Sequence, residues 1–191
     1  MNAKNEQKER THEAILASAG KLLREKGIGG TRVAEVMRGA GLTVGGFYAH
    51  FTSKEALLDE TLRRTARRMR EKLLQRIEEK PLAVRAEVIL KRYLSAAHRD
   101  DPSSGCPLPA VVGEVSTTTP EHREVLAEQV SQLAEALADH LAEGDRRSKR
   151  ATAIGMIALL YGGISLARAV RDTALSDEIL RACRAFGKAA R

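Results

Sequence analysis

Cysteine is the residue type in this chain best suited to covalent chemistry near neutral pH, and there are two cysteines. Cys106 lies in Gly105-Cys106-Pro107, where a loop is predicted to meet the start of a helix. A thiol at a helix N-terminus can react with electrophiles or oxidants. Free cysteine is also a common small buried hydrophobe, so a sensor and a packing residue both remain open at Cys106. Cys183, on the last predicted helix, is interpreted as packing.

Histidine, carboxylate and motif patterns give no support to an enzyme. The five histidines are scattered along the chain at His12, His50, His98, His122 and His140. No zinc-protease motif, phosphate-binding loop or nucleophile elbow is present, and no carboxylate pair recurs at catalytic spacing. The two cysteines lack metal-site spacing. We therefore predict no catalytic residue, no metal and no cofactor.

The stretch Gly41 to Glu55 (GLTVGGFYAHFTSKE) has the residue types of a recognition element. Gly41 is predicted to end one helix, and the Thr43 hydroxyl to cap the next. Phe47 and Phe51 are four residues apart, which places both aromatic rings on one face of a short helix. Two aromatics on one face would anchor this helix in a core and leave its other face for recognition.

The opposite face of this short helix carries Val44, Tyr48 and His50. A second helical stretch, Thr31 to Ala40, precedes it with an apolar stripe. Two helices joined by a glycine-containing turn form the helix-turn-helix pattern, which is typical of DNA binding.

The run from Gly29 to Leu58 (GGTRVAEVMRGAGLTVGGFYAHFTSKEALL) resembles the DNA-binding region of the tetracycline-repressor (TetR) family of bacterial transcription regulators. The resemblance covers about residues 8–60. It rests on residues that match at unbroken spacing: Thr31, Val33, Ala40-Gly41, Phe47-Tyr48, His50-Phe51 and Ser53-Lys54-Glu55. It departs from the commonest pattern at Arg32, Val44 and Gly46, which affects base preference.

The resemblance implies that residues 43–50 enter the major groove. It assigns phosphate or base contacts to the polar and small residues of this region: Arg32, Thr43, Val44, Gly45, Gly46, Tyr48, His50 and Lys54. The adjacent glycines weaken a helix. They either let the backbone approach DNA closely or form a tolerated weak helix.

The rest of the chain is predicted to be all-α, with about nine helices, no strand and no internal repeat. Residues 8–26 form the first helix, with Gly27 as its stop. A long connector helix begins at Ser53 and ends before Pro81, and a second long helix follows from Leu82 to Arg99. Thr118 and Glu121 have the spacing of a capping box, which predicts a helix from there to about 143. Two further helices are expected over 151–171 and over 176–188, with Ser176 as the cap of the last one. The predicted domains are a DNA-binding domain, 1–52, and an effector-binding and dimerisation domain, 53–191.

Charge is distributed unevenly over the 191 residues, whose formal net charge is +7. Residues 1–72 hold 15 Lys and Arg against nine Asp and Glu, whereas 73–191 hold 17 against 16. The basic excess of the N-terminal third fits a polyanionic partner. The arginine run of the connector (Arg63, Arg64, Arg67, Arg68, Arg70, with Lys72) is either a solvated helix face or a source of nonspecific attraction to DNA.

The segment 151–167 is uncharged and apolar nearly all round, so it is predicted to be buried on two sides, by its own domain and by a second subunit. Family resemblance implies a homodimer through the last two helices. The expected interface residues are Leu159, Gly162, Gly163, Leu166 and Cys183. With 17 residues and several small ones, the segment is not predicted to span a membrane. The polar start, MNAKNEQKER, has no apolar signal region and favours a cytoplasmic location.

Family resemblance also implies an effector cavity among the helices after the connector. Its expected lining or sensing residues are Cys106, Tyr93, His98, Leu108, Met156 and Tyr161. The function predicted is a homodimeric repressor released from a palindromic operator in double-stranded DNA by a small-molecule effector, through a tilt of the connector helix. One alternative is a redox- or electrophile-sensing repressor switched through Cys106. A nonspecific architectural DNA-binding protein and an enzyme fit less well, because residues 73–191 are nearly neutral and no catalytic motif is present.

Overall fold

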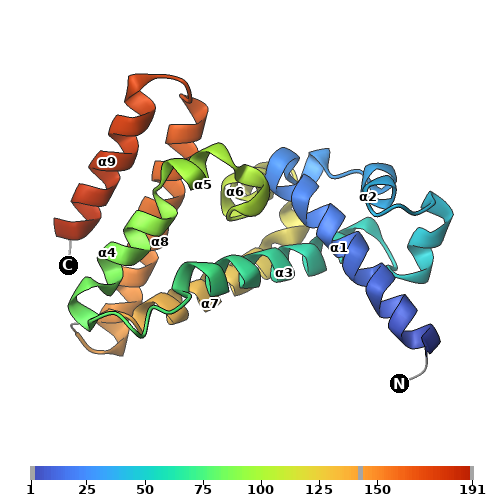
Figure 1. The fold of residues 1–191 in the computed structure, drawn as a ribbon, viewed down its shortest axis with the longest axis horizontal. Coiled ribbons are helices and arrows are strands. Elements are labelled where there is room, and N and C mark those ends of the chain that lie inside the picture. The colour runs from blue at the N-terminus through green and yellow to red at the C-terminus, as the bar shows by residue number, and fades with distance from the viewer. Residues whose placement is uncertain (1–2, 142–143, 190–191) are drawn as a thin grey trace. The chain divides into compact units, whose positions relative to one another are not determined.

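The computed structural model of the chain describes residues 3–141 and 144–189. Within those ranges the protein contains nine α-helices, three short 3₁₀-helices and no strand, which confirms the all-α fold class (Figure 1). The elements in chain order are α1 (Ala3–Gly30), α2 (Val33–Gly39), η1 (Val44–Ala49), α3 (Lys54–Leu74), α4 (Leu82–Tyr93), α5 (Ala96–Asp100), η2 (Pro102–Ser104), α6 (Leu108–Thr117), η3 (Pro120–His122), α7 (Arg123–Ala138), α8 (Arg146–Ala169) and α9 (Ala174–Ala189).

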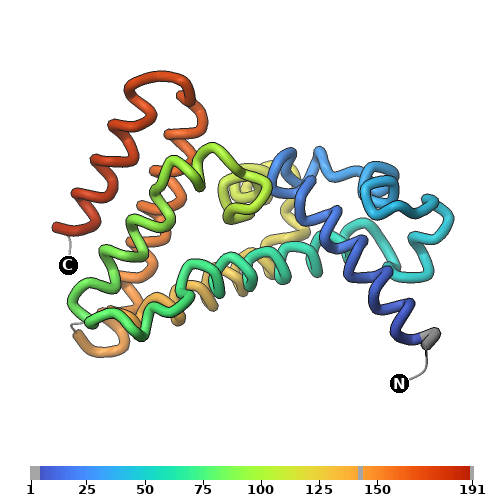
Figure 2. Tube along the Cα trace, viewed as in Figure 1, coloured from blue at the N-terminus to red at the C-terminus, as the bar shows by residue number. Residues whose placement is uncertain are grey.

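The chain forms two compact units, and the colour in Figure 2 follows the residue number along the chain through both. The first, here called the head, comprises the chain up to Arg67 together with Cys106–Ala127. The second, the body, comprises Arg68–Gly105 together with the chain from Glu128 on. Each unit is therefore made of two chain segments, and α3 and α7 contribute residues to both.

The head has an apolar core built where the helical spacing of the sequence puts it. One cluster joins α1, α2, η1 and the start of α3 through Ile15, Leu16, Ala19, Val36, Met37, Phe47, Phe51 and Leu57. A second cluster joins α1, α3, α6 and the start of α7 through Leu23, Ile28, Leu58, Leu62, Val111, Val115 and Val125. Phe47 of η1 and Phe51, two residues after η1, are almost completely buried, as predicted for the anchors of this element.

Gly27 interrupts α1 as the sequence predicts, with a left-handed φ of 73° that favours glycine. The residues after this break are held by a carboxylate of α6. Glu114 accepts hydrogen bonds from the backbone N–H of Ile28 at 3.1 Å and of Gly29 at 2.7 Å. Thr31 then donates its hydroxyl to the carbonyl of Gly27 at 2.6 Å. The turn between α1 and α2 is therefore held by side chains on both sides.

The body is organised around α8, which packs against α4, α5 and α9 (Figure 1). Its buried face carries Ala153, Met156, Ile157, Leu160, Gly163, Ile164 and Ala167. In the described part of the chain, α8 is the one helix long and apolar enough to cross a membrane. One side of α8 is buried against its neighbours, whereas Ile154 and Leu166 are exposed.

Several helix boundaries differ from the predicted ones. The connector helix ends at Leu74, before the predicted Pro81, and Arg92 donates to the carbonyl of Leu73 at 2.8 Å near that end. The predicted helix 82–99 is two helices, because Ser95 accepts a hydrogen bond from the N–H of His98 and caps α5.

The last helix also begins earlier than predicted. It starts at Ala174, so Ser176 lies within its first turn, where its buried hydroxyl donates to the carbonyl of Ala167 at 2.7 Å. Ser176 therefore joins α9 to α8 and does not cap α9.

Gly163 gives a direct test of the packing between α8 and α9. A Cβ at this position would lie 2.9 Å from both Cys183 Sγ and Leu94 Cδ2. We expect Gly163→Val to lower the free energy of unfolding by about 2 kcal/mol, because overpacking displaces these neighbours. Gly113→Val in α6 is the matched control, since a Cβ there meets nothing within 4 Å; its change should stay within about 0.5 kcal/mol. Urea denaturation measures both, and equal effects would contradict the packing described.

Candidate functional site

The turn that separates α2 from η1 has a defined geometry. Gly41 follows the end of α2 with a φ of 72°. Its N–H donates to the carbonyl of Arg38 at 3.0 Å, and that of Leu42 donates to Met37 at 2.9 Å. These two bonds form the Schellman motif, which needs a residue that tolerates positive φ. Gly41 therefore sets the direction in which η1 leaves α2.

The predicted recognition helix is a 3₁₀-helix, η1. Its bonds include Gly46 N–H to the carbonyl of Thr43 at 3.2 Å and His50 N–H to Phe47 at 2.9 Å. The prediction that the Thr43 hydroxyl caps this helix was wrong, since the side chain makes no cap hydrogen bond. Adjacent Gly45 and Gly46 lower α-helix propensity, which is consistent with a short 3₁₀ segment.

Aromatic rings hold η1 against the head. Phe47 and Phe51 stack with ring centroids 5.7 Å apart, and Phe51 also stacks on His12 of α1 at 4.6 Å. His12 in turn lies 2.7 Å from a carboxylate oxygen of Glu60 on α3. This series of contacts joins α1, η1 and α3, so the exposed face of η1 rests on a fixed base.

The opposite face of η1 lies in solvent. Tyr48 is 78% exposed and Val44 is 51% exposed. Gly45 is exposed as well, and a Cβ there would meet nothing within 4 Å. Arg32 and Thr43 are also exposed. These side chains and the open backbone at Gly45 form one accessible surface, here called the η1 face.

The remaining predicted contact residues are partly covered. Gly46, His50 and Lys54 are half-buried. Nδ1 of His50 is buried with no hydrogen-bond partner in the described part of the chain. Burial, followed by the positive charges of His12 and Lys8, lowers the pKa of His50. His50 is therefore a weaker candidate for a cationic phosphate contact than Arg32 or Lys54.

The arginine run of α3 is not one solvated face. Arg64 is buried and forms an ion pair with Glu13 of α1, and it also donates to the Glu13 carbonyl at 3.0 Å. Arg70 donates to Gln132 of α7 at 3.2 Å. At least two members of the run therefore have structural partners and serve packing between helices.

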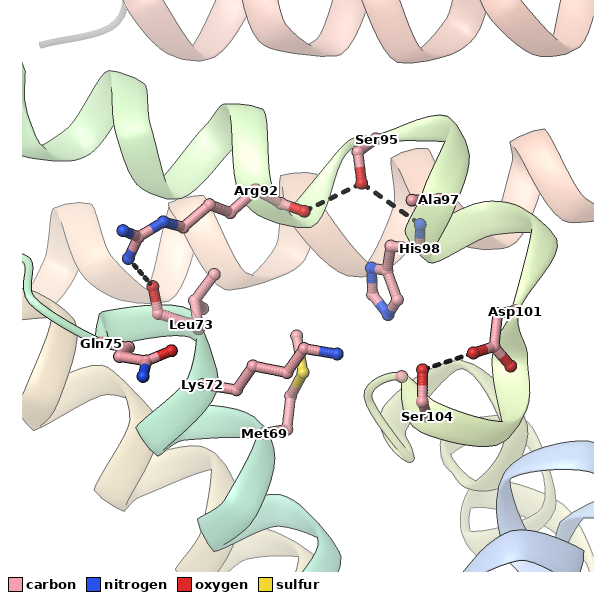
Figure 3. A pocket seen from close by; sticks show the side chains of 11 residues that line it. Met69, Lys72, Leu73, Gln75, Arg92, Ser95, Ala97, His98, Asp101 and Ser104 are labelled. Carbon is pink, nitrogen blue, oxygen red and sulfur yellow. Dashed lines mark hydrogen bonds between the residues drawn. The ribbon is translucent and has the colours of Figure 1, made fainter.

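The body contains a cavity of about 600 Å³ between α3, α4, α5 and η2 (Figure 3). Its wall combines apolar side chains with charged and hydroxyl groups: Met69, Lys72, Leu73, Gln75, Arg92, Ser95, Ala97, His98, Asp101, Ser104 and Gly105. This volume lies in the range of small-molecule sites, about 300–1,000 Å³.

His98 is the buried polar group of this wall. Its Nδ1 lies 2.7 Å from the carbonyl of Tyr93, so this nitrogen carries the proton and donates. The Tyr93 ring packs edge-on against the imidazole, with centroids 4.5 Å apart. The pKa of His98 is lowered to about 4, mainly by burial and to a smaller extent by the nearby charges of Arg168 and Lys72, while the hydrogen bond to Tyr93 opposes the shift. The imidazole is therefore neutral at pH 7.

A network of charged side chains supports the cavity wall from behind. Arg168 of α8 donates to the carbonyl of His98 at 2.6 Å and to that of Arg99 at 3.2 Å, which satisfies the C-terminal end of α5. Arg99 itself donates to Asp177 of α9 at 2.6 Å. The cavity wall at α5 is thereby joined to α8 and α9.

Of the six predicted effector residues, His98 lines this cavity. Tyr93 lies behind it, against the imidazole ring. The other four do not belong to the cavity wall: Cys106, Leu108, Met156 and Tyr161. The predictions missed Lys72, which was placed in a charge run interpreted as a solvated face or a source of nonspecific attraction to DNA, and Ser95, which was placed inside a continuous helix. The Asp101-Pro102-Ser103-Ser104 sequence is a turn signal that could have pointed to this wall.

Cys106 is a buried residue, with only 4% of its surface exposed. It immediately precedes Pro107, the N-cap residue of α6. Reactive cysteines are usually accessible to their oxidant, so burial favours the packing interpretation at this position.

The predicted interface residues of the last two helices divide between two environments. Leu166 is 58% exposed, and a Cβ at Gly162 would meet nothing within 4 Å. Gly163 and Cys183 instead lie against each other within one chain. Leu159 is half-buried and lies close to Gly187 of α9. The open positions are thus Gly162 and Leu166.

Comparison with known proteins identifies two matching family profiles. The profile of bacterial regulatory proteins of the tetR family matches residues 15–61, and that of the tetracyclin repressor-like C-terminal domain matches residues 81–183. No curated protein sequence matches the chain.

Solved structures with a similar fold include other regulators. Escherichia coli NemR in its reduced form is 22% identical with a TM-score of 0.78, covering 94% of this chain and 95% of that one. A TetR transcriptional regulator from Chloroflexus aurantiacus is 23% identical with a TM-score of 0.78, covering 96% and 95%. A putative TetR-family regulator from Rhodococcus sp. is 19% identical with a TM-score of 0.75, covering 95% and 96%. At these identities the likeness concerns the fold alone.

The lowered pKa of His98 predicts a pH dependence of stability. Its folded pKa of about 4 lies below the ordinary value of 6.5, so the unfolded chain binds the proton more tightly. Stability is complete above pH 6.5 and falls as the pH drops toward 4. Lowering the pH from 7 to 5 should reduce the free energy of unfolding by about 2 kcal/mol through His98. Urea denaturation at both pH values should show that His98→Gln loses less stability than the wild type by this amount; parallel losses would contradict a neutral, buried His98.

Proposed function

Because this chain belongs to the TetR family of bacterial transcription regulators, we propose that it is a homodimeric, cytoplasmic repressor that binds a palindromic operator and is released by a small-molecule effector. The observation that carries this proposal is the η1 face, an accessible surface held on a rigid aromatic base next to a turn fixed by Gly41. Members of the family bind DNA and dimerise, and they are regulators rather than enzymes.

The proposed DNA contacts follow from the geometry of the head. Tyr48 and Thr43 are hydroxyl donors on the η1 face, and hydroxyl groups commonly bind phosphate oxygens. Lys54 is the first residue of α3, where its ammonium group adds to the positive end of the helix dipole. Gly45 leaves the backbone open for a close approach. Arg32 precedes α2 and is exposed, which suits a phosphate or a guanine edge.

Exposed apolar side chains on α8 and α9 support the proposed homodimer. Ile154 and Leu166 on α8, and Leu175 and Phe186 on α9, have between 46% and 67% of their surface exposed. Large apolar side chains exposed on two adjacent helices favour association, and a two-fold axis would bring the same helices of a second copy against them. A two-fold dimer would present two η1 faces to the two halves of a palindrome.

The cavity in the body is proposed as the effector site. Met69, Lys72 and Leu73 of its wall belong to α3, whose earlier residues Leu58 and Leu62 lie in the core of the head. A ligand that shifts the last turns of α3 would therefore act on a helix that is also part of the head. Ligand bound in the cavity would then lower the affinity of the head for operator DNA, and DNA would lower the affinity of the cavity for the ligand by the same factor.

The alternative of a sensor at Cys106 has less support, because the thiol is buried. It remains testable, since oxidation that abolishes DNA binding in the wild type and not in Cys106→Ser would favour it. A nonspecific architectural role would need a basic surface over the whole protein, which residues 73–191 lack.

DNA binding is tested with the region upstream of the gene that encodes this protein, titrated with salt. We expect tight, salt-sensitive binding to a palindrome. Tyr48→Ala should weaken it on the order of tenfold, because a contact on the η1 face is lost. Lys54→Gln should reduce the salt slope by about 1. Lys80→Gln, in the body, is the matched control and should leave both unchanged. Tyr48→Ala that binds normally, or that loses the dimer, would contradict the assignment of Tyr48 to the DNA face.

The oligomeric state tests the interface on α8 and α9. We expect the wild type to run as a dimer in light scattering coupled to size exclusion. The double substitution of Leu166→Glu and Phe186→Glu should give a monomer, because two charges would be desolvated at the interface of each subunit. Leu82→Glu, an equally apolar exposed position on α4, should stay dimeric. A monomeric wild type, or a dimeric double variant with native helix content, would rule out this interface.

A further inference from the structure

We propose that the cavity of the body takes a small amphiphilic organic anion, a carboxylate with an apolar tail, whose charge is met by Lys72. The inference rests on the proposed function only in treating the ligand as the effector. It follows from the distribution of charge and apolar surface on the cavity wall.

Lys72 is the charged group that is available to a ligand. Lys72 lines the cavity and is exposed to solvent, and in Figure 3 its ammonium group points toward His98 and Ser104. Among the described residues no carboxylate forms an ion pair with Lys72, although other lysines of the chain have such partners, as Lys91 has in Glu87 at 2.9 Å. An ammonium group without a counter-charge at a cavity wall favours an anion there.

The one carboxylate of the wall does not compete for this position. Asp101 accepts hydrogen bonds from the hydroxyls of Ser103 and Ser104, each at 2.6 Å and each on a different oxygen. The Ser103 bond, followed by the Ser104 bond, lowers the pKa of Asp101 to about 2, so it stays ionised and occupied within its own loop. Each carboxylate oxygen of Asp101 thus has a donor from its own loop.

The remaining polar groups add no negative charge. Arg92 is a second cation at the wall, and one of its N–H groups donates to the carbonyl of Leu73, which leaves other donors of its guanidinium for a ligand. His98 is neutral at pH 7. With two cations, one locally satisfied carboxylate and one neutral imidazole, the formal charge of the wall is positive, and a cationic ligand would be repelled.

Apolar side chains define the rest of the ligand. Met69, Leu73 and Ala97 provide a hydrophobic surface beside the Lys72 stem. A ligand that filled the cavity would place its apolar part against these residues and its anionic head toward Lys72 and Arg92. This arrangement excludes small, purely polar anions as the best ligands, because they would leave the apolar wall uncovered.

Two matched sets of probes test this ligand class. The first set is 4-phenylbutyrate with its amide and its amine, and the second is octanoate with its amide and its amine. Within a set the skeleton is constant and only the charge of the head group changes. Isothermal titration calorimetry of the full chain measures each affinity without DNA. We expect each carboxylate that binds to have an affinity about tenfold higher than that of its amide, and higher still relative to its amine.

Lys72→Met should remove the preference for the carboxylate and leave the affinity of the amide unchanged. Lys80→Met, on the loop before α4, should change neither. The proposal is overturned if neither carboxylate exceeds its amide, if an amine binds best, or if the preference survives in Lys72→Met. Competition between carboxylate and operator is measured separately. A carboxylate that binds through Lys72 without changing DNA affinity would support the anion site and count against the effector role, so the two failures are distinguishable.

Discussion

The continuity of α3 is the constraint on which the account depends. Its backbone is one hydrogen-bonded helix from Lys54 to Leu74. Leu58 and Leu62 belong to the core of the head, and Leu73 belongs to the cavity wall of the body. A helix without proline or an internal break resists sharp bending, because a kink breaks backbone hydrogen bonds. A displacement of its last turn must therefore be taken up by the whole helix or by the contacts at its start.

Long side chains from distant elements form hydrogen bonds with backbone groups at the helix ends of both units. Glu114 accepts from the backbone N–H groups that follow the break in α1, and Arg168 donates to the last carbonyls of α5. Arg92 does the same near the end of α3. Such contacts satisfy backbone groups that would otherwise need water. They also make each helix end depend on a neighbouring helix, so tertiary contacts help to set the geometry of the turn between α1 and α2 and of the cavity wall.

The sequence was sufficient to predict the features that depend on local patterns. The apolar spacing of α1 and α3, the stop at Gly27 and the aromatic anchors of η1 all follow from side-chain periodicity or glycine conformation. Helix boundaries were mispredicted, among them the end of α3 at Leu74, near which Arg92 of α4 donates to the carbonyl of Leu73, and the break at Ser95, whose hydroxyl caps α5 by a local bond. The cavity wall was largely missed because its residues come from four elements. Lys72 in particular carries no local signal that separates a cavity lysine from a solvated one.

Coupling of the head and the cavity through α3 would be visible in hydrogen exchange. The measurement compares amide exchange in the free protein and in the protein bound to operator DNA. We expect operator DNA to change the exchange rates in the last turn of α3 and in 95–105, residues remote in sequence from the η1 face, as well as in the head. Changes confined to residues of the head, with the cavity wall unaffected, would contradict the coupling.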